Sequence, residues 1–188
     1  MILAGHETTA VALFWSLYLL ALDPATQEQV ASEAHGASAN GALDIDQLKF
    51  TRAVLDETMR LYPSAFLIAR AAAGPDVISG IPVRKNDVIL VSPWLLHRHE
   101  KLWPDPEVFM PSRFMPPAPP PDRFAYLPFG VGARICIGAH FALVEATLAL
   151  AKIIGSFRVT LLDKTPVMPV GVVTTQPDRS PMFAISPR

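Results

Sequence analysis

A glycine-spaced stretch from Phe129 to Gly138 constrains the fold more than any other feature, because it holds the only cysteine of the chain. It reads Phe-Gly-Val-Gly-Ala-Arg-Ile-Cys-Ile-Gly, and Cys136 is followed by an apolar pattern with helical spacing. Glycine permits positive φ angles and lets the backbone approach a flat ligand closely. A cysteine at or just before a helix N-terminus is favoured as a thiolate. The stretch therefore predicts a cradle around a functional sulfur.

Two chemistries suit a single cysteine in such a loop. A metal ion removes the thiol proton outright, and a cysteine thiolate is one of the axial ligands that proteins give to haem iron. Alternatively, Cys136 is a nucleophile assisted by His140, although the neighbouring sequence offers neither an orienting third group nor oxyanion donors. The interpretation without chemistry is a buried cysteine in a glycine turn.

The stretch resembles the haem-binding signature of the cytochrome P450 haem-thiolate monooxygenases, F-x-x-G-x-R-x-C-x-G. All its fixed positions are filled, by Phe129, Gly132, Arg134, Cys136 and Gly138. Gly130 is also common at its position in that family. The resemblance implies that Cys136 is the axial ligand of the iron of haem b, and that the surrounding residues bind this cofactor.

Composition places the chain among globular proteins, since 51% of its 188 residues are apolar and 18% are charged. A net charge of -1 with scattered Lys and Arg argues against a nucleic-acid partner. One cysteine excludes an internal disulfide framework and suits a reducing compartment, which favours a cytoplasmic location. The apolar run from Ala10 to Leu22 is too short to span a membrane and lacks the basic start of a signal peptide, so it predicts a buried helix.

That buried helix is predicted over residues 2–22 and ends at Asp23-Pro24. Its segment Ala4-Gly5-His6-Glu7-Thr8-Thr9 resembles the distal oxygen-binding motif of the family, A-G-x-(D/E)-T-T. Gly5 gives room beside the helix, and a threonine hydroxyl can bond the carbonyl four residues earlier. The resemblance implies that Thr8 hydrogen-bonds oxygen on the distal side of the haem and that Glu7 relays protons from solvent, with His6 only a neighbour. In isolation, Glu7-Thr8-Thr9 is merely a polar helical turn.

Periodicity predicts a mainly α fold with small β-sheets. Further helices are expected over residues 24–36 and from 48 or 51 to 62, with a loose loop at 38–41 between them. Short strands within residues 66–91 should form one small sheet, and residues 94–106 a short helix and a turn in which His97 and His99 are surface or packing residues. A proline-rich segment at 116–121 resembles the family's irregular meander, with a proline-recognition motif as the alternative. Strands at 157–162 and 182–185 should be joined by a long loop.

Glu57 and Arg60 stand three residues apart on one helical face, where an exposed pair contributes only about 0.2–0.5 kcal/mol. The segment resembles the family's E-x-x-R motif, in which the pair is buried and joined by a second arginine. Here that partner is Arg113, in a Pro-Ser-Arg-Phe segment that keeps three residues of the P-E-R-F box and replaces its acid with Ser112. The resemblance implies a structural triad of these three charged residues.

The resemblance also implies how the cofactor and substrate are held. Arg70 and Arg134 occupy positions where family members place arginines that bind haem propionates. Residues 2–9, 64–69 and 170–174 are largely apolar and correspond to segments that line the substrate side of the haem. A lipophilic substrate follows from the resemblance.

The whole chain, residues 1–188, corresponds to the C-terminal part of the P450 domain, from the middle of the long distal helix to the C-terminal strands. The function implied is a monooxygenase that activates O2 and inserts one oxygen atom into the substrate. Its electrons are expected from a separate ferredoxin or flavoprotein reductase, since no such module is recognisable in the sequence. The alternative is an inert haem-binding remnant or one half of a split enzyme.

Overall fold

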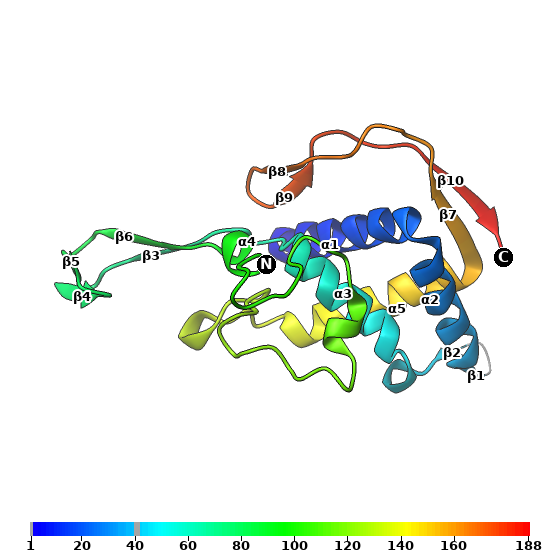
Figure 1. Cartoon of the computed structure of the whole chain (residues 1–188), viewed down its shortest axis with the longest axis horizontal. Coiled ribbons are helices and arrows are strands. Elements are labelled where there is room, and N and C mark those ends of the chain that lie inside the picture. The colour runs from blue at the N-terminus through cyan, green and yellow to red at the C-terminus, as the bar shows by residue number, and fades with distance from the viewer. Residues whose placement is uncertain (1, 40–41) are drawn as a thin grey trace.

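The computed structural model describes residues 2–39 and 42–188, and the side chains of residues 5–38 and 42–188. Helix α1 (Ile2–Leu22) lies along the middle of the molecule, with α3 (Lys49–Leu61) and α5 (Ala139–Ser156) packed against it (Figure 1). Helix α2 (Pro24–Gly36) covers one end of this group by contacts with α5. The described part of the chain is thus built on four long helices, which confirms the predicted mainly α class.

The first two helices are separated where the sequence predicts. The Asp23 carboxylate accepts a hydrogen bond from the Thr26 amide at 3.1 Å, and Pro24 is the first residue of α2. Such a cap stabilises a helix start by about 1 kcal/mol. The loose loop expected at 38–41 is wrong in part: Ser38–Ala39 (β1) pairs with Ala42–Leu43 (β2), while residues 40–41 lie outside the described residues.

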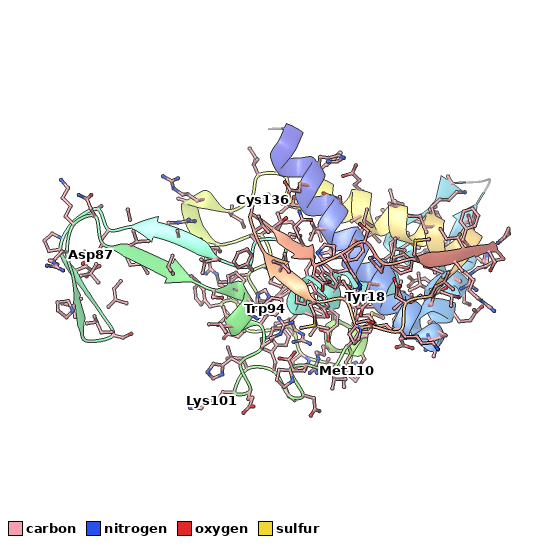
Figure 2. All side chains as sticks on the ribbon, turned by 90° about the horizontal axis from the view of Figure 1, so that it is seen from above. Tyr18, Asp87, Trp94, Lys101, Met110 and Cys136 are labelled. Atoms are coloured by element: carbon pink, nitrogen blue, oxygen red, sulfur yellow. The ribbon has the colours of Figure 1, made fainter. Side chains whose placement is uncertain are left out.

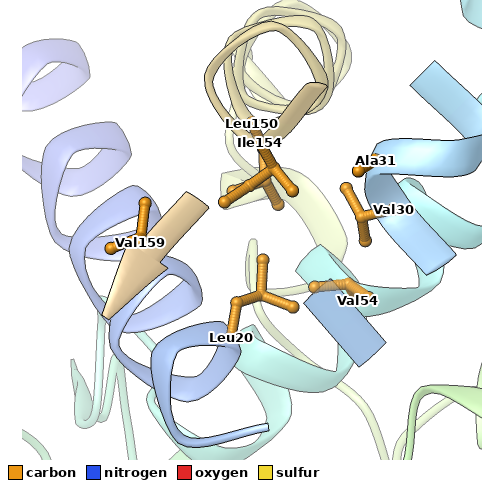
Figure 3. Packing of buried hydrophobic residues seen from close by; sticks show 7 residues of the cluster. All are labelled: Leu20, Val30, Ala31, Val54, Leu150, Ile154 and Val159. Atoms are coloured by element: carbon orange, nitrogen blue, oxygen red, sulfur yellow. The ribbon is translucent and has the colours of Figure 1, made fainter. Parts of the chain in front are cut away.

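The main hydrophobic core draws residues from distant parts of the sequence, as Figure 3 shows. It joins α1, α2, α3, α5 and β7 (Phe157–Leu161) through Leu20, Val30, Ala31, Val54, Leu150, Ile154 and Val159. Helices α2 and α5 approach closely, since a Cβ on Gly155 would lie 3.0 Å from the Cβ of Ala34. This core holds α1 and α5 in a fixed relation, and the two predicted motifs sit on these helices or beside them.

The strands after α3 form an arm that projects away from the helices (Figure 1). Strand β3 (Ile68–Ala71) pairs with β6 (Val88–Val91), and β4 (Asp76–Ile78) pairs with β5 (Ile81–Val83) across a turn at Ser79 and Gly80. Both turn residues have positive φ, 50° and 81°, as in the turns that suit two-residue hairpins. The single small sheet predicted for residues 66–91 is therefore wrong, because the structure has two separate two-stranded pairs, and β3 begins at Ile68 rather than at 66.

Short helical segments connect the arm to the cysteine stretch. These are α4 (Pro93–Leu96) and the 3₁₀ turns η2 (Pro111–Phe114) and η3 (Gly132–Arg134), and a further 3₁₀ turn, η1 (Ile45–Gln47), precedes α3. At the C-terminal end β7 pairs with β10 (Phe183–Pro187), as the sequence predicts. The connection between them is not only a loop: β8 (Pro169–Gly171) and β9 (Thr175–Pro177) form a hairpin that returns to α1.

Candidate functional site

The cysteine loop is closed by backbone hydrogen bonds. The amide of Cys136 donates to the carbonyl of Phe129 at 3.0 Å, which brings the two ends of the stretch together. Gly130 and Gly132 have φ of 71° and 78°, values that L side chains adopt only at a cost. The positive φ expected for Gly138 is wrong, because its φ is −90°; an added Cβ there would be in ordinary contact with the Cys136 sulfur at 3.9 Å. Two of the three glycines thus set the loop conformation.

Cys136 itself is exposed, although cysteine is among the residue types most often buried. Exposed apolar side chains stand on both sides of it in the sequence: Ile135 is 57% exposed, Ile137 91% and Phe141, on the first turn of α5, 71%. A thiol bordered by uncovered apolar groups is suited to a flat, apolar ligand that covers them. The buried-cysteine interpretation is therefore wrong for this structure.

The surroundings of the thiol also bear on the kind of metal it can hold. Within residues 2–39 and 42–188, no three His, Cys, Asp or Glu residues are grouped as ligands of a metal ion. The iron of a haem needs no such group, because the porphyrin supplies its other ligands. His140 is exposed on α5, and no hydrogen bond joins it to Cys136 in the described structure, so the Cys–His nucleophile gains no support.

Phe129 anchors the loop to the helices. Its ring packs against a buried cluster made of Ala12 from α1, Leu55 and Met59 from α3, and Ala146 from α5. The loop start is fixed as well, because the Leu127 amide donates to Nε2 of His97 at 2.8 Å. The cysteine loop is thereby tied to the same α1 that carries the predicted distal motif.

His97 is one residue whose contribution sequence reasoning missed, since it predicted only a surface or packing residue. The imidazole is fully buried, and this burial lowers the pKa of His97 from 6.5 to about 4. The backbone carbonyls of Arg60 and Met59 act in the opposite direction and raise the pKa, but by less. Neutral imidazole can accept at Nε2 only if its hydrogen is on Nδ1. The apolar residues directly before it, Trp94-Leu95-Leu96, were the available signal in the sequence.

The distal motif lies on the first turns of α1. The Thr8 hydroxyl reaches the Gly5 carbonyl at 3.5 Å, three residues back rather than the expected four, and the helix stays continuous. Gly5 is exposed, and an added Cβ would have no atom of the described residues within 4 Å, so there is room beside the helix here. Glu7 is half-buried, and its Oε1 accepts hydrogen bonds from Thr174 at 2.9 Å and Gln176 at 2.8 Å.

The three segments predicted to line the substrate side lie together. Ser64 donates to the Thr8 carbonyl at 2.9 Å, which joins residues 64–69 to α1. A Cβ on Gly171 would lie 2.8 Å from the Phe66 ring, so the 170–174 segment packs on the same stretch. The sequence identified these segments but not Gln176, which lies just beyond the predicted range.

The three charged residues of the predicted triad also meet. Glu57 and Arg60 are fully buried, and two hydrogen bonds of 2.7 and 2.9 Å join the guanidinium to the two carboxylate oxygens. Arg113 adds a third contact, from Nε to Glu57 Oε1 at 3.3 Å, and the Met110 amide a fourth at 2.8 Å. Arg60 satisfies its remaining donors on the carbonyls of His97, Pro106 and Val108. The set fixes α3 to the 97–113 segment.

The two arginines predicted to bind propionates are both exposed. Arg70 lies in β3, and its side chain donates a hydrogen bond to the adjacent Ala69 carbonyl at 2.8 Å. Arg134 is in η3, two residues before the cysteine. Figure 2 shows Asp87 at the far end of the β3–β6 arm from Cys136, so Arg70 lies on an element that extends from the site. Neither guanidinium is paired with a described carboxylate, which leaves both able to bind an anionic group.

One described helix, α5, has the length and hydropathy of a membrane-spanning helix, and α1 and α2 would pass the same test together although they bend by 116°. Core helices of globular proteins share these properties. Leu150 and Ile154 of α5 belong to the main hydrophobic core, as does Leu20 of α1. Each of these two helices therefore contributes side chains to the hydrophobic core.

Comparison with known proteins matches the family model "Cytochrome P450" to residues 1–180. The chain is 38% identical over 173 residues to cyclooctatin synthase of Streptomyces melanosporofaciens. The aligned residues cover 90% of this chain and 38% of that protein. It is 34% identical over 197 residues to cytochrome P450 3A12 of Canis lupus familiaris (100% and 39%), and 35% over 181 residues to LUTEIN DEFICIENT 5, chloroplastic, of Arabidopsis thaliana (93% and 30%). The chain spans about a third of the length of these relatives. With its cysteine loop, buried Glu57–Arg60–Arg113 set and match over nearly its whole length, the chain belongs to the cytochrome P450 family.

Proposed function

We propose that this chain is the C-terminal part of a haem-thiolate monooxygenase that activates O2 and inserts one oxygen atom into a lipophilic substrate. The observation that carries the proposal is the exposed thiol of Cys136 in a loop in which Gly130 and Gly132 hold positive φ and the neighbouring apolar side chains are exposed. Membership of the P450 family supports the same assignment.

The residues present fit a haem. Cys136 offers a thiolate at the start of α5, Phe129 anchors the loop, Gly130 holds a positive φ in it, and Gly138 is the residue before α5, beside the sulfur. No described carboxylate is paired with Arg70 or Arg134, and guanidinium groups bind carboxylates such as propionates with charge-assisted hydrogen bonds. When bound, haem supplies an iron whose thiolate ligand favours cleavage of the O–O bond.

The remaining steps belong to the protein. Gly5 leaves space beside α1, and Thr8 presents a hydroxyl at this space. The Glu7 carboxylate takes a proton from solvent and passes it toward Thr8, which orients it toward the reacting oxygen. Residues 64–69 and 170–174 exclude water and hold an apolar substrate beside the same turn of α1.

The proposal includes a separate electron donor, either a ferredoxin or a flavoprotein reductase. The substrate is lipophilic because the segments around Phe66 and Gly171 expose apolar groups: Leu67 is 43% exposed, Val172 69% and Val173 79%. O2 is the second substrate. A cytoplasmic location is proposed on the ground that the chain has a single, reduced cysteine.

The reduced carbon monoxide spectrum of the haem-loaded protein tests the ligand. Thiolate ligation shifts the Soret band to the red, and Cys136→Ala removes that shift, whereas the control Ala133→Ser in the same loop keeps it. A red-shifted band that survives in Cys136→Ala refutes the assignment.

The alternative, haem binding without turnover, gives the thiolate band but no product. Product formation by the parent separates the two. Thr8→Ala then tests the role of Thr8: in an active enzyme it lowers the product formed per O2 consumed by about 10-fold or more, since a positioned proton-transfer group contributes about 10²–10⁴-fold. Haem content stays at the parent level. Equal product yield per O2 in variant and parent removes Thr8 from the mechanism.

A further inference from the structure

The β8–β9 hairpin meets α1 at Glu7. Thr174 Oγ donates to Glu7 Oε1 at 2.9 Å, and Gln176 Nε2 donates to the same oxygen at 2.8 Å. Gln176 Nε2 also donates to the Thr174 hydroxyl at 3.0 Å. Thr174 is only 4% exposed, so these bonds are largely shielded from solvent.

The hydrogens of this network can be counted without conflict. A side-chain amide has two hydrogens, so Gln176 can donate one to Glu7 and the other to Thr174. The Thr174 hydroxyl accepts that bond and gives its only hydrogen to Glu7. An ionised carboxylate can only accept hydrogen bonds. The Gln176 side chain must therefore turn its amide nitrogen, and not its amide oxygen, toward Glu7.

The hairpin is itself held rigidly at this point by Thr175, the residue between the two donors. Its hydroxyl donates to the Pro63 carbonyl at 2.5 Å and its amide to the Ser64 carbonyl at 3.2 Å. Its carbonyl accepts from the indole of the buried Trp15 at 2.7 Å. The donors to Glu7 therefore come from a backbone fastened both to α1 and to the segment after α3.

We propose that Thr174 and Gln176 are positioning residues that hold Glu7 by Oε1 and leave Oε2 as the oxygen that takes up and releases the proton. Oε1 accepts two hydrogen bonds, and no described residue donates to Oε2. A proton on Oε1 would displace one of these donors, whereas a proton on Oε2 displaces none. Water gives one proton to Oε2 and the same proton leaves from Oε2, so the carboxylate and its two hydrogen bonds are restored. This inference rests on the proposed function of Glu7.

A double-variant cycle tests whether the hairpin holds Glu7, and it needs neither haem nor turnover. Glu7→Leu and Gln176→Leu should each lower the denaturation midpoint, and the double variant should lower it by less than the sum of the two single effects, because both single variants remove the bond between Gln176 and Glu7. Gln29→Leu, at an exposed position of α2, serves as the control and should add its effect independently to Glu7→Leu. Additive losses for Glu7 and Gln176 overturn the proposal.

The positioning role is tested in the haem-loaded protein. Gln176→Leu and Thr174→Val should lower the product formed per O2 by about 3- to 10-fold, below the ~10²-fold or more of a group that transfers the proton itself. Haem content and the thiolate band should not move. Thr174→Ser, which keeps the hydroxyl, should restore the yield, and Thr160→Val, at an exposed position of β7, should leave it unchanged.

The outcomes separate this inference from the proposed function. Unchanged yield in Gln176→Leu and Thr174→Val, with the thiolate band present, overturns the positioning role alone. A parent protein without a thiolate band overturns the proposed function, and the double-variant cycle then decides by itself whether the hairpin holds Glu7.

Discussion

Removing the Glu57 carboxylate should be among the most destabilising single changes in this chain. Glu57→Ala leaves the guanidinium of Arg60 fully buried without its counter-ion, and it deprives the Met110 amide of its acceptor. Breaking a buried ion pair from one side costs about 3–5 kcal/mol. Arg60 keeps three carbonyl acceptors, so the arginine stays hydrogen-bonded but uncompensated in charge.

That loss is a large part of the about 5–15 kcal/mol that stabilises an ordinary domain. For a chain of this size it corresponds to a fall in melting temperature of about 6–20 °C. Arg113→Leu should cost less, about 1–3 kcal/mol, because Glu57 retains the bidentate contact with Arg60 and loses one bond of 3.3 Å.

The assay is urea unfolding of the parent, the two variants and Glu145→Gln, which changes an exposed acid of α5 and should stay within about 0.5 kcal/mol of the parent. The reasoning is refuted if Glu57→Ala loses less than about 1 kcal/mol, or if Arg113→Leu is as costly as Glu57→Ala. Either result would mean that the three residues do not form a buried ionic set.

Three further predictions follow from single residues. Burial lowers the pKa of His97 to about 4, so the unfolded chain binds more protons than the folded chain between about pH 4 and 6.5. The contribution of His97 to the free energy of unfolding is therefore complete above about pH 6.5 and falls by up to about 3 kcal/mol toward pH 4. The difference between parent and His97→Gln unfolding curves against pH should show this slope, and a flat difference contradicts it. Gly171→Ala should cost about 1–3 kcal/mol by forcing the Phe66 ring to move, whereas Gly74→Ala, where nothing lies within 4 Å, should be nearly neutral in the same unfolding assay. Gly132→Ala should cost about 1–2 kcal/mol because φ is 78°, and an unchanged unfolding midpoint would show that the loop relaxes at no cost.

The sequence by itself determined the elements that depend on local chemistry. Asp23-Pro24 separates α1 from α2 because proline fits only the first turn of a helix and the aspartate caps it. The end of α3 at Leu61 precedes Pro63, which disfavours helix in the residue before it. The cysteine loop could also be predicted from the sequence, because the fixed spacings of its glycine, arginine and cysteine residues are local features.

What the tertiary structure decided depends on which distant groups meet. The strands of residues 66–91 have the right composition for one sheet, but pairing is set by the geometry of turns and contacts, and they form two separate pairs. The sequence predicted only a surface or packing role for His97. The fold buries its imidazole completely and places the Leu127 amide where it donates a hydrogen bond to Nε2.

The acid Glu7 shows the same division. Its place in a recognisable motif was visible in the sequence, but its two donors lie more than 160 positions away in a hairpin that the sequence did not predict. Hydrogen bonds between such distant segments form only because the core fixes α1 relative to the segment after α3. Thr175 then binds the hairpin to both of them, through the indole of Trp15 and the carbonyl of Pro63. The chemistry of the residue was therefore determined by sequence, and its orientation by the fold.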